Sequence, residues 1–242
     1  MNRFLKNNVC FLALFVLTFT ALAVAILLTD KAQLHLWFNS CHTAFGDSVL
    51  PYYTLIADYG FYLIALALLF WRAGATVYLM IAEGVGAVIV QILKHIICAP
   101  RPKLFFDLEN NPDALPLVDG VQLHSYYSFP SGHTCTFFIL FLCLATLVWY
   151  YRQSSLANDK KKETWLNMSL QVLFFILALL GGYSRIYLSQ HFATDVFAGG
   201  IIGVISVAML YPAFLWLNNK FPKVCAWHIS LPTRGNKSDK QV

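Results

Sequence analysis

Charge is what this sequence lacks most. Only 12% of its 242 residues are Asp, Glu, Lys or Arg, while 58% are hydrophobic. A soluble domain carries about twice that fraction of charged residues, because polar side chains must cover its surface. The shortage of charge excludes an ordinary soluble protein and predicts an integral membrane protein.

Paired cysteines, repeats and linkers are also missing. The 6 cysteines have none of the close spacings typical of zinc sites, and at least three of them lie in apolar runs. The cysteines therefore predict neither a zinc site nor a disulfide framework. A single disulfide between Cys41 and Cys98 is the alternative to six free cysteines. No repeat, low-complexity tract or Gly/Ser-rich linker divides the chain, so we expect a single membrane domain over residues 1–242.

Long apolar runs are what the chain has instead. A helix needs about 20 mostly apolar residues to cross about 30 Å of hydrocarbon. Four runs of this kind contain no acid, and two more contain one acid each, Asp58 and Glu83. We therefore expect an all-α polytopic membrane protein, a six-transmembrane helix bundle. Its spans are expected at about 9–29, 51–71, 73–98, 132–151, 166–184 and 196–219.

The first run has a second interpretation, as a cleaved signal peptide. Arg3 and Lys6 precede it, and it contains an Ala-Leu-Ala stretch at 21–23. The run is long for the apolar part of a signal peptide, which favours an uncleaved span. Both interpretations deliver the next loop to the far side of the membrane, so the remaining topology is the same.

Basic residues are unevenly shared between the two sides of these spans. With the N-terminus inside, only five of the 17 Lys and Arg residues fall on the outer side: Lys31, Lys94, Arg101, Lys103 and Arg185. Cytoplasmic segments carry an excess of Lys and Arg. We therefore expect both termini in the cytoplasm and a basic cytoplasmic tail at 220–242. This distribution accounts for the net charge of +5 and gives no reason to expect nucleic acid binding.

Two outer loops, 99–131 and 185–194, hold the unusual residues. The first follows the motif KHIICAPRP at 94–102, in which Pro100 and Pro102 end the third span and expose Arg101 at the outer surface. Lys94 lies in the last turns of the same span. Two snorkelling anchors are the simple alternative, but outer cations run against the positive-inside bias.

A second motif, PSGH at 130–133, lies where the fourth span begins. A helix N-terminus offers free backbone N–H groups and the positive end of its dipole, which suits anions. Gly132 permits close approach of a ligand to the backbone. Taken alone, Ser131 is an ordinary helix N-cap and His133 an ordinary interfacial residue.

The third motif is SRIYLSQHFATD at 184–195. It supplies Arg185 and a pair, His191 and Asp195, whose side chains face one another if the segment is helical. A carboxylate that fixes one imidazole nitrogen leaves the other free as a nucleophile or base. The plainer alternative makes Asp195 a helix cap and His191 a surface residue.

Together the motifs predict a site for phosphate or a similar oxyanion, with three cations and no cluster of acids to hold Mg²⁺. The pattern is Lys, six residues, Arg-Pro; then Pro-Ser-Gly-His; then Ser-Arg, five residues, His, three residues, Asp. It resembles the three-part signature of the type 2 phosphatidic acid phosphatase family, whose site is shared with the vanadium haloperoxidases. Every defining position is matched within residues 94–195.

The resemblance implies a catalytic set and a phosphate-binding set. By it, His191 attacks phosphorus to form a phosphohistidine, Asp195 orients its ring, and His133 protonates the leaving oxygen and then helps to activate water. The groups implied to hold the phosphoryl oxygens are Lys94, Arg101, Ser131, Gly132 and Arg185. Ser184 and Asp58 are candidates for support behind them. Neither a metal nor a cofactor is implied.

The family and the outer motifs imply a membrane lipid phosphate or diphosphate as substrate, with its tail in the bilayer. Candidates are undecaprenyl diphosphate, phosphatidylglycerol phosphate, phosphatidic acid and the phosphates of lipid A. Metal-independent hydrolysis is the expected activity. Phosphotransfer to a second lipid would use the same residues, so it stays open as an alternative activity. A third alternative is a protein that only binds the anion, and it is disfavoured because it gives His191, Asp195 and His133 no role.

The family and the compact loops imply a bacterial inner-membrane protein with its site on the periplasmic side. An endomembrane with the site facing the lumen is the alternative, and the sequence does not fix the oligomeric state. Glu83, among small residues, is expected to bond between helices, whereas Asp58 is balanced between structure and function. The loop 103–129 is a candidate lid or selector whose aromatic side chains lie at the interface: Phe105, Phe106, Tyr126 and Tyr127.

Overall fold

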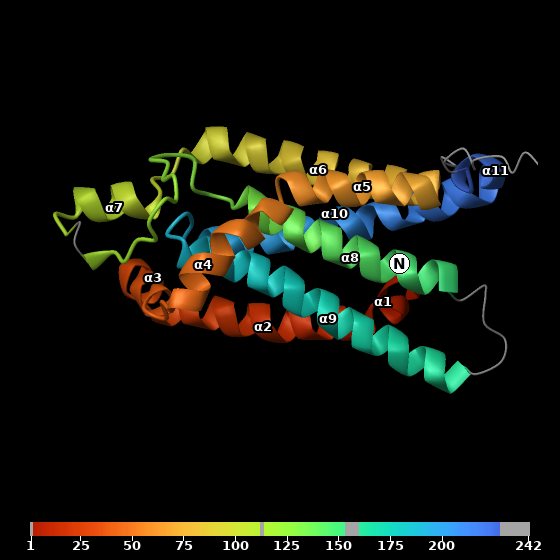
Figure 1. Ribbon diagram of the computed structural model, residues 1–242, viewed down its shortest axis with the longest axis horizontal. Helices are drawn as coiled ribbons and strands as arrows, with labels where there is room; N and C mark the ends of the chain where they lie inside the picture. Colours follow the sequence, from red (N-terminus) through yellow and green to blue (C-terminus); the bar gives the residue numbers. More distant parts are fainter. Residues whose placement is uncertain (1, 112–113, 153–159, 228–242) are drawn as a thin grey trace, which may run out of the picture.

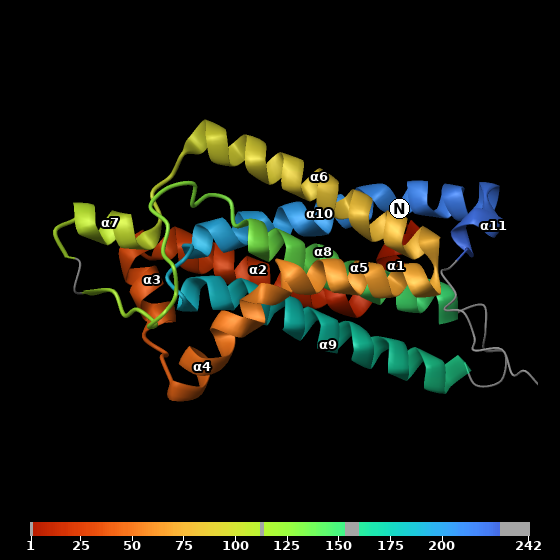
Figure 2. The ribbon, with the colours of Figure 1, turned by 45° about the horizontal axis from the view of Figure 1, so that its top comes forward.

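The protein is a bundle of long helices with short helices gathered at its two ends (Figures 1 and 2). The structure, a computed structural model, describes residues 2–111, 114–152 and 160–227, and this part of the chain contains no strand. The long helices are α2 (Val9–Leu28), α6 (Ala73–Ile97), α8 (Gly132–Arg152), α9 (Lys160–Tyr187) and α10 (Ala193–Lys220). Within the described residues, 5 helices are long and apolar enough to cross a membrane.

The second expected span, 51–71, is a broken helix that starts earlier. Helix α4 (Ala44–Tyr53) runs into the 3-10 turn η1 (Thr54–Ile56), and α5 (Tyr59–Trp71) then leaves at 47°. The backbone groups freed by the break are taken up locally, because Ala57 N–H donates to the Thr54 carbonyl and Asp58 N–H to that of Leu55. Counted as one span, this pair raises the number of candidate spans to 6.

Short helices mark the two ends of the bundle. Helices α3 (Lys31–Asn39), α4 and α7 (Pro102–Leu108) lie at one end, at the left of Figure 1. Helices α1 (Asn2–Asn7) and α11 (Pro222–Cys225) lie at the other. The long outer loop 99–131 is therefore partly helical.

The short outer loop is smaller than the expected 185–194. Helix α9 continues to Tyr187 and α10 begins at Ala193, so Arg185 lies inside a helix. The extra turn is stabilised because Asn39 Nδ2 donates to the carbonyls of Ile186 and Tyr187 at 3.2 and 2.8 Å, and the Ile186 carbonyl also accepts from Ser189 N–H at 2.9 Å.

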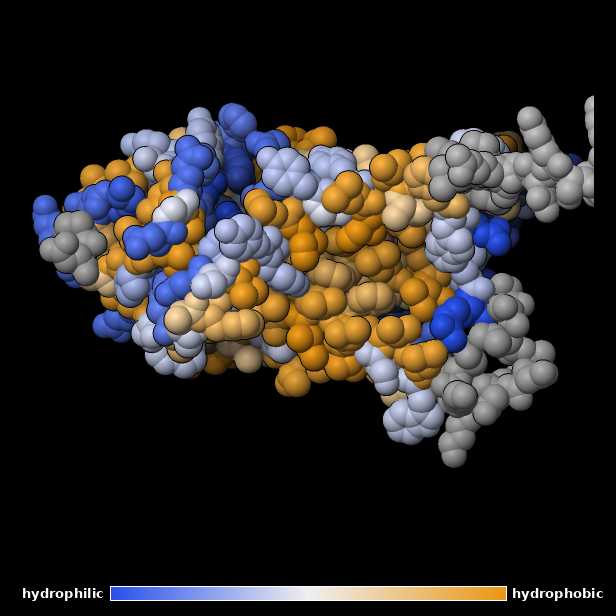
Figure 3. Space-filling view, in the orientation of Figure 1, coloured by the Kyte–Doolittle hydropathy of each residue, from blue (hydrophilic) through white to orange (hydrophobic). Residues whose placement is uncertain are grey.

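Helix α8 forms the centre of the bundle and packs against α6, α9 and α10. Its side chains are buried along most of its length, as expected for a helix that is hydrophobic on all sides and has no polar face. Small residues on the neighbouring helices permit this packing: Gly181 lies against the Phe137 ring and Gly203 against the Cys135 carbonyl. Figure 3 shows an apolar band over the middle of the bundle, with hydrophilic side chains gathered at the end that carries α3, α4 and α7. The fold is that of an all-α, multi-helix membrane protein.

Three smaller expectations can be compared with the structure. Thr136 Oγ1 on α8 donates to Glu83 Oε1 on α6 at 2.6 Å, which confirms an interhelical bond for this acid. Cys41 and Cys98 are both free and exposed, so they form no bridge here. From position 228 onward, the expected basic tail at 220–242 lies outside the described residues.

Candidate active site

The three motifs meet at the end of the bundle that carries α3, α4 and α7 (Figure 2). Lys94 lies near the end of α6 and within electrostatic range of Arg101, Arg185 and Asp195, which come from three other segments. Arg101 and Arg185 are likewise within range of His191. Residues up to 101 positions apart in the sequence, Lys94 and Asp195, thus belong to one cluster of three cations near one histidine.

His191 lies in the short loop between α9 and α10 and is 1% exposed. The loop is fixed because the backbone N–H groups of Gln190 and His191 both donate to the Arg185 carbonyl, at 3.0 and 3.1 Å. Nδ1 of His191 faces Oδ2 of Asp195 at 3.4 Å, longer than a well-formed hydrogen bond. Nε2 is therefore the nitrogen that does not face the carboxylate. Burial lowers the pKa of His191 to about 3 against the opposing effect of Asp195, so the imidazole is neutral at ordinary pH.

Asp195 is held more firmly by its other neighbours. Its Oδ2 accepts from Ser128 Oγ at 2.5 Å and from Phe192 N–H at 3.0 Å, the latter closing the first turn of α10. Asp195 therefore caps a helix and also faces His191, while the alternative that makes His191 a surface residue is wrong, because this side chain is buried. The expected helical pairing is wrong in detail, because His191 lies in the loop before α10. Ser128 carries no motif signal and was missed.

Arg101 is buried at 9% exposure, so the expectation that it is exposed at the outer surface is wrong. Its Nη1 donates to Gln190 Oε1 at 2.8 Å and its Nε to the Tyr126 carbonyl at 3.1 Å. The chain after Pro100 turns inward because the loop 99–131 closes over it, with Arg101 N–H bonded to the Ser125 carbonyl at 2.8 Å. A buried guanidinium needs acceptors for its donors, and this loop supplies them.

Arg185 is buried at 6% exposure and retains an unused donor. Its Nη1 bonds to Thr54 Oγ1, on the 3-10 turn of the broken span. Its Nε is buried with no hydrogen-bond partner within the described part of the chain. Buried donors are nearly always paired, so this atom marks a place for a ligand oxygen.

The N-terminus of α8 lies beside these cations. Ser131 Oγ accepts from Thr134 N–H at 3.3 Å and from Thr134 Oγ1 at 2.9 Å, so its side chain acts as the helix N-cap. Gly132 is partly exposed in the first turn, where backbone N–H groups have no intrahelical acceptor. His133 Nε2 lies 3.1 Å from Asp58 Oδ2, and Lys94 and Arg185 are within electrostatic range of its ring.

Of the two candidates for support behind the site, Asp58 contacts a site residue and Ser184 does not. Asp58 reaches the site because the break between η1 and α5 turns its side chain toward His133. Ser184 is buried on α9, where its Oγ donates to the Gly181 carbonyl at 2.7 Å. Its bonding is local to that helix, so it does not join the cluster.

Helix α3 packs against the residue that follows His191, which the sequence did not indicate. Lys31 Nζ lies 3.9 Å from the centroid of the Phe192 ring, and the His35 ring meets Phe192 edge-on at 5.1 Å. Burial lowers the pKa of His35 to about 4 and leaves the ring neutral. Phe105 and Phe106 pack on the same aromatic group, so they point inward instead of lying at the interface. Only Tyr126 and Tyr127 of the loop aromatics are largely exposed, at 53% and 43%.

Comparison with known proteins gives a family match. Residues 74–219 match the model of the PAP2 superfamily. Probable lipid phosphate phosphatase 4 of Arabidopsis thaliana is 32% identical over 140 residues, which are 54% of this chain and 44% of that protein. Bacitracin transport permease protein BcrC of Bacillus licheniformis is 29% identical over 166 residues, or 66% of this chain and 70% of that one.

A solved structure has the same fold. The PAP2-type phosphatidylglycerolphosphate phosphatase from Bacillus subtilis matches with a TM-score of 0.58 over 87% of this chain and 96% of its own, at 21% sequence identity. The matched family region includes every motif residue from Lys94 to Asp195.

Proposed function

This chain belongs to the PAP2 superfamily, and we propose that it is a phosphatase that removes phosphate from a membrane lipid phosphate or diphosphate without a metal ion. One observation carries the proposal. The neutral, buried His191 faces Asp195 through Nδ1 and lies among Lys94, Arg101 and Arg185. This arrangement joins a nucleophile to an anion site.

In the first step, Nε2 of His191 attacks phosphorus and the bond from phosphorus to the lipid oxygen breaks. His133 gives its proton to that leaving oxygen. The positive charge that develops on His191 is stabilised by Asp195, which Ser128 and the Phe192 N–H hold in place. The products of this step are the lipid alcohol, or the lipid monophosphate, and a phosphohistidine.

In the second step, a water oxygen attacks phosphorus and the phosphorus–nitrogen bond breaks. His133, now neutral, accepts a proton from this water, which restores both histidines. Through both steps the charge of the phosphoryl oxygens is balanced by Lys94, Arg101 and Arg185, and the unpaired Nε of Arg185 offers a donor for one of them. The free N–H of Gly132 offers another.

Three observations support a lipid substrate on the outer side. The motif cluster lies at the ends of the long helices, where a phosphate at headgroup depth would lie with its tail along the apolar band. The excess of basic residues on the opposite side favours an extracytoplasmic site and cytoplasmic termini. The name of the Arabidopsis relative, probable lipid phosphate phosphatase 4, gives lipid phosphates as its substrates. We propose a bacterial inner membrane as the location and retain four substrate classes: undecaprenyl diphosphate, phosphatidylglycerol phosphate, phosphatidic acid and lipid A phosphates.

The test is phosphate release by the purified full chain in detergent, with a chelator present. Each lipid class is supplied alone, beside a soluble phosphate ester. We expect phosphate release from at least one lipid with excess chelator present, since Lys94, Arg101 and Arg185 provide the positive charge that a metal ion would provide. Activity that disappears in chelator and returns with a divalent cation would contradict the metal-free mechanism. Release that requires a second lipid as acceptor would identify phosphotransfer instead of hydrolysis.

Asp58 is proposed as a positioning residue for His133. We expect Asp58→Asn to lower kcat/KM for a lipid phosphate by about tenfold, because the amide keeps the shape but no longer stabilises the protonated imidazole. For an aryl phosphate, whose leaving group needs no proton, the loss should stay below about twofold. Steady-state kinetics with both substrates measure the difference.

Asp47→Asn is the matched control for this substitution. Asp47 also pairs with a histidine, His42 at 2.8 Å, on the same end of the bundle, and it accepts from the Tyr187 hydroxyl at 2.6 Å, a side chain with no proposed catalytic or phosphate-binding role. The Asp47→Asn substitution should leave the ratio of kcat/KM for the lipid phosphate to kcat/KM for the aryl phosphate unchanged. Equal losses on lipid and aryl phosphates in Asp58→Asn would mean that Asp58 only supports the fold.

A further inference from the structure

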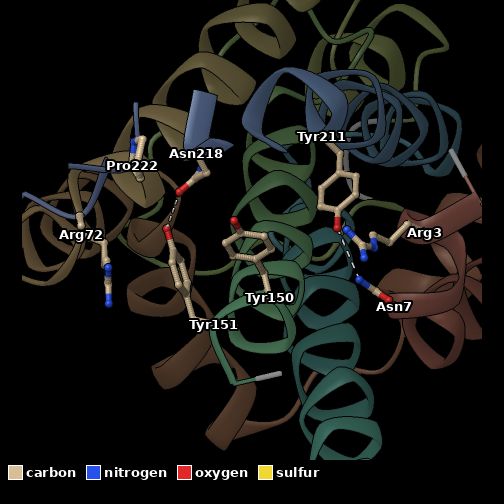
Figure 4. Close-up of a pocket in the computed structure, with 9 residues that line it drawn as sticks. Arg3, Asn7, Arg72, Tyr150, Tyr151, Tyr211, Asn218 and Pro222 are labelled. Atoms are coloured by element: carbon tan, nitrogen blue, oxygen red, sulfur yellow. Dashed lines mark hydrogen bonds between the residues drawn. The ribbon is translucent and has the colours of Figure 1, made fainter. Parts of the chain in front are cut away.

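A polar cavity of about 510 Å³ lies at the end of the bundle opposite His191 (Figure 4). Its volume is within the range of about 300–1,000 Å³ that small-molecule sites occupy. It is walled by α1, the corner between α5 and α6, the end of α8, and α10 with α11. The lining residues are Arg3, Asn7, Arg72, Tyr150, Tyr151, Tyr211, Asn218, Pro222 and Ala226.

The cavity has the composition of an anion site. Two guanidinium groups, three phenol hydroxyls and two carboxamides line it, and no carboxylate is among the described residues of its wall. The ion pairs of the described part of the chain join His42, His133 and His191 to acids, so neither Arg3 nor Arg72 is neutralised by one of them. Among the described residues, both arginines therefore bring to one cavity a positive charge that no ion pair balances.

The charged and hydroxyl-bearing side chains of the wall lie side by side around Tyr150. Figure 4 shows Tyr150 between Arg72 on one side and Arg3 with Tyr211 on the other, and both arginines lie within electrostatic range of Tyr150. The Arg72 guanidinium lies 5.3 Å from the centre of the Tyr151 ring. Asn7 Nδ2 donates to the Tyr211 hydroxyl at 3.4 Å, which ties the N-terminal helix to α10.

The position of the cavity indicates where its ligand comes from. Helix α8 ends at Arg152, α10 ends at Lys220 and α2 begins at Val9, so the cavity lies where the spans end. Lipid headgroup phosphates are concentrated at this depth, and arginines there attract anionic lipids. Arginines that merely anchor a helix point separately into the headgroup layer, whereas these two line the same hydroxyl-rich pocket.

We propose that this basic cavity binds a phosphate group, and that its occupant in a bilayer is the headgroup of an anionic phospholipid from the leaflet opposite the His191 site. The guanidinium groups of Arg3 and Arg72 carry the charge recognition, and the hydroxyls of Tyr150 and Tyr211 donate to the remaining phosphate oxygens. The lipid tails run along the apolar surface of the bundle.

Native mass spectrometry of the delipidated full chain in detergent tests this proposal. The chain is titrated with phosphatidylglycerol, with zwitterionic phosphatidylcholine and with inorganic phosphate. We expect tighter binding of phosphatidylglycerol than of the other two. Arg72→Gln and Arg3→Gln should each weaken it about fivefold, while Arg72→Lys keeps most of the affinity. Lys223→Gln, an exposed charge at the same end that does not line the cavity, is the matched control and should change nothing.

The outcomes separate the possibilities. Phosphatidylglycerol binding that is insensitive to both arginine substitutions overturns the site. Inorganic phosphate that binds as tightly as phosphatidylglycerol overturns the lipid headgroup as the occupant. The Arg72→Gln chain should still release phosphate at the opposite end within about twofold of the wild-type rate, since the cavity holds none of the proposed catalytic groups. That rate also shows that the variant is folded, and the lipid-binding result stands whether or not the proposed phosphatase activity is correct.

Discussion

Replacing His191 by alanine is expected to abolish phosphate release, lowering kcat by about four orders of magnitude or more. The reason is that His191 is the proposed covalent nucleophile. Its Nδ1 faces Asp195, which leaves Nε2 as the nitrogen for attack, and Arg101 and Arg185 lie within electrostatic range of the neutral ring. Alanine leaves these cations in place, so the variant should still bind the lipid phosphate. Single-turnover phosphate release and lipid binding, measured on the same sample, separate chemistry from binding.

His124→Ala is the control for this experiment. His124 is an exposed histidine in the loop 99–131, on the same end of the bundle, and belongs to none of the motifs. It should retain wild-type kcat within about twofold. Because His191 is buried, the melting temperature of His191→Ala is needed as well. A folded His191→Ala chain that retains a tenth of wild-type turnover would remove His191 from the mechanism.

Replacing His133 by glutamine is expected to lower kcat for a lipid phosphate by about two to four orders of magnitude. Glutamine can still bond to Asp58, so the N-terminus of α8 should keep its place, but it cannot transfer a proton. An alkoxide is a poor leaving group, so the first step should become the slow one. Quenched-flow kinetics with the purified variant measure this step directly.

The same variant should behave differently with an aryl phosphate. Departure of a phenolate needs no acid, so the first turnover should be fast and the second step slow, because His133 also activates water. We expect a burst of phenolate stoichiometric with the enzyme, followed by slow turnover. Equal slowing of lipid and aryl substrates with no burst would show that His133 binds the phosphate and transfers no proton.

The membrane architecture was largely predictable because the length of an apolar run is a local property. Runs such as 132–151 and 196–219 became α8 and α10 with ends shifted by a few residues. The break in the second span was not predictable, since no local signal marks it and the contact that it allows, between Asp58 and His133, lies between two helices. The same break places Thr54 against Arg185.

The site was predictable as a set of motifs but not as a set of contacts. The expected exposure of Arg101 failed because prolines indicate where a helix ends, not where the next side chain turns. Gln190 and the Tyr126 carbonyl, which hold that guanidinium, belong to distant segments. No sequence pattern predicts the packing of Lys31 and His35 on Phe192 either, because these residues come together only when α3 folds over the site.

Trapping the covalent intermediate tests the central claim most directly. The purified chain would be mixed with a lipid phosphate labelled with ³²P, quenched in base within the first turnover and digested for peptide mapping. The mechanism predicts a base-stable, acid-labile phosphoryl group on His191, absent from His191→Ala. Label on another residue, or lipid hydrolysis that proceeds with no labelled enzyme at any time, would contradict it.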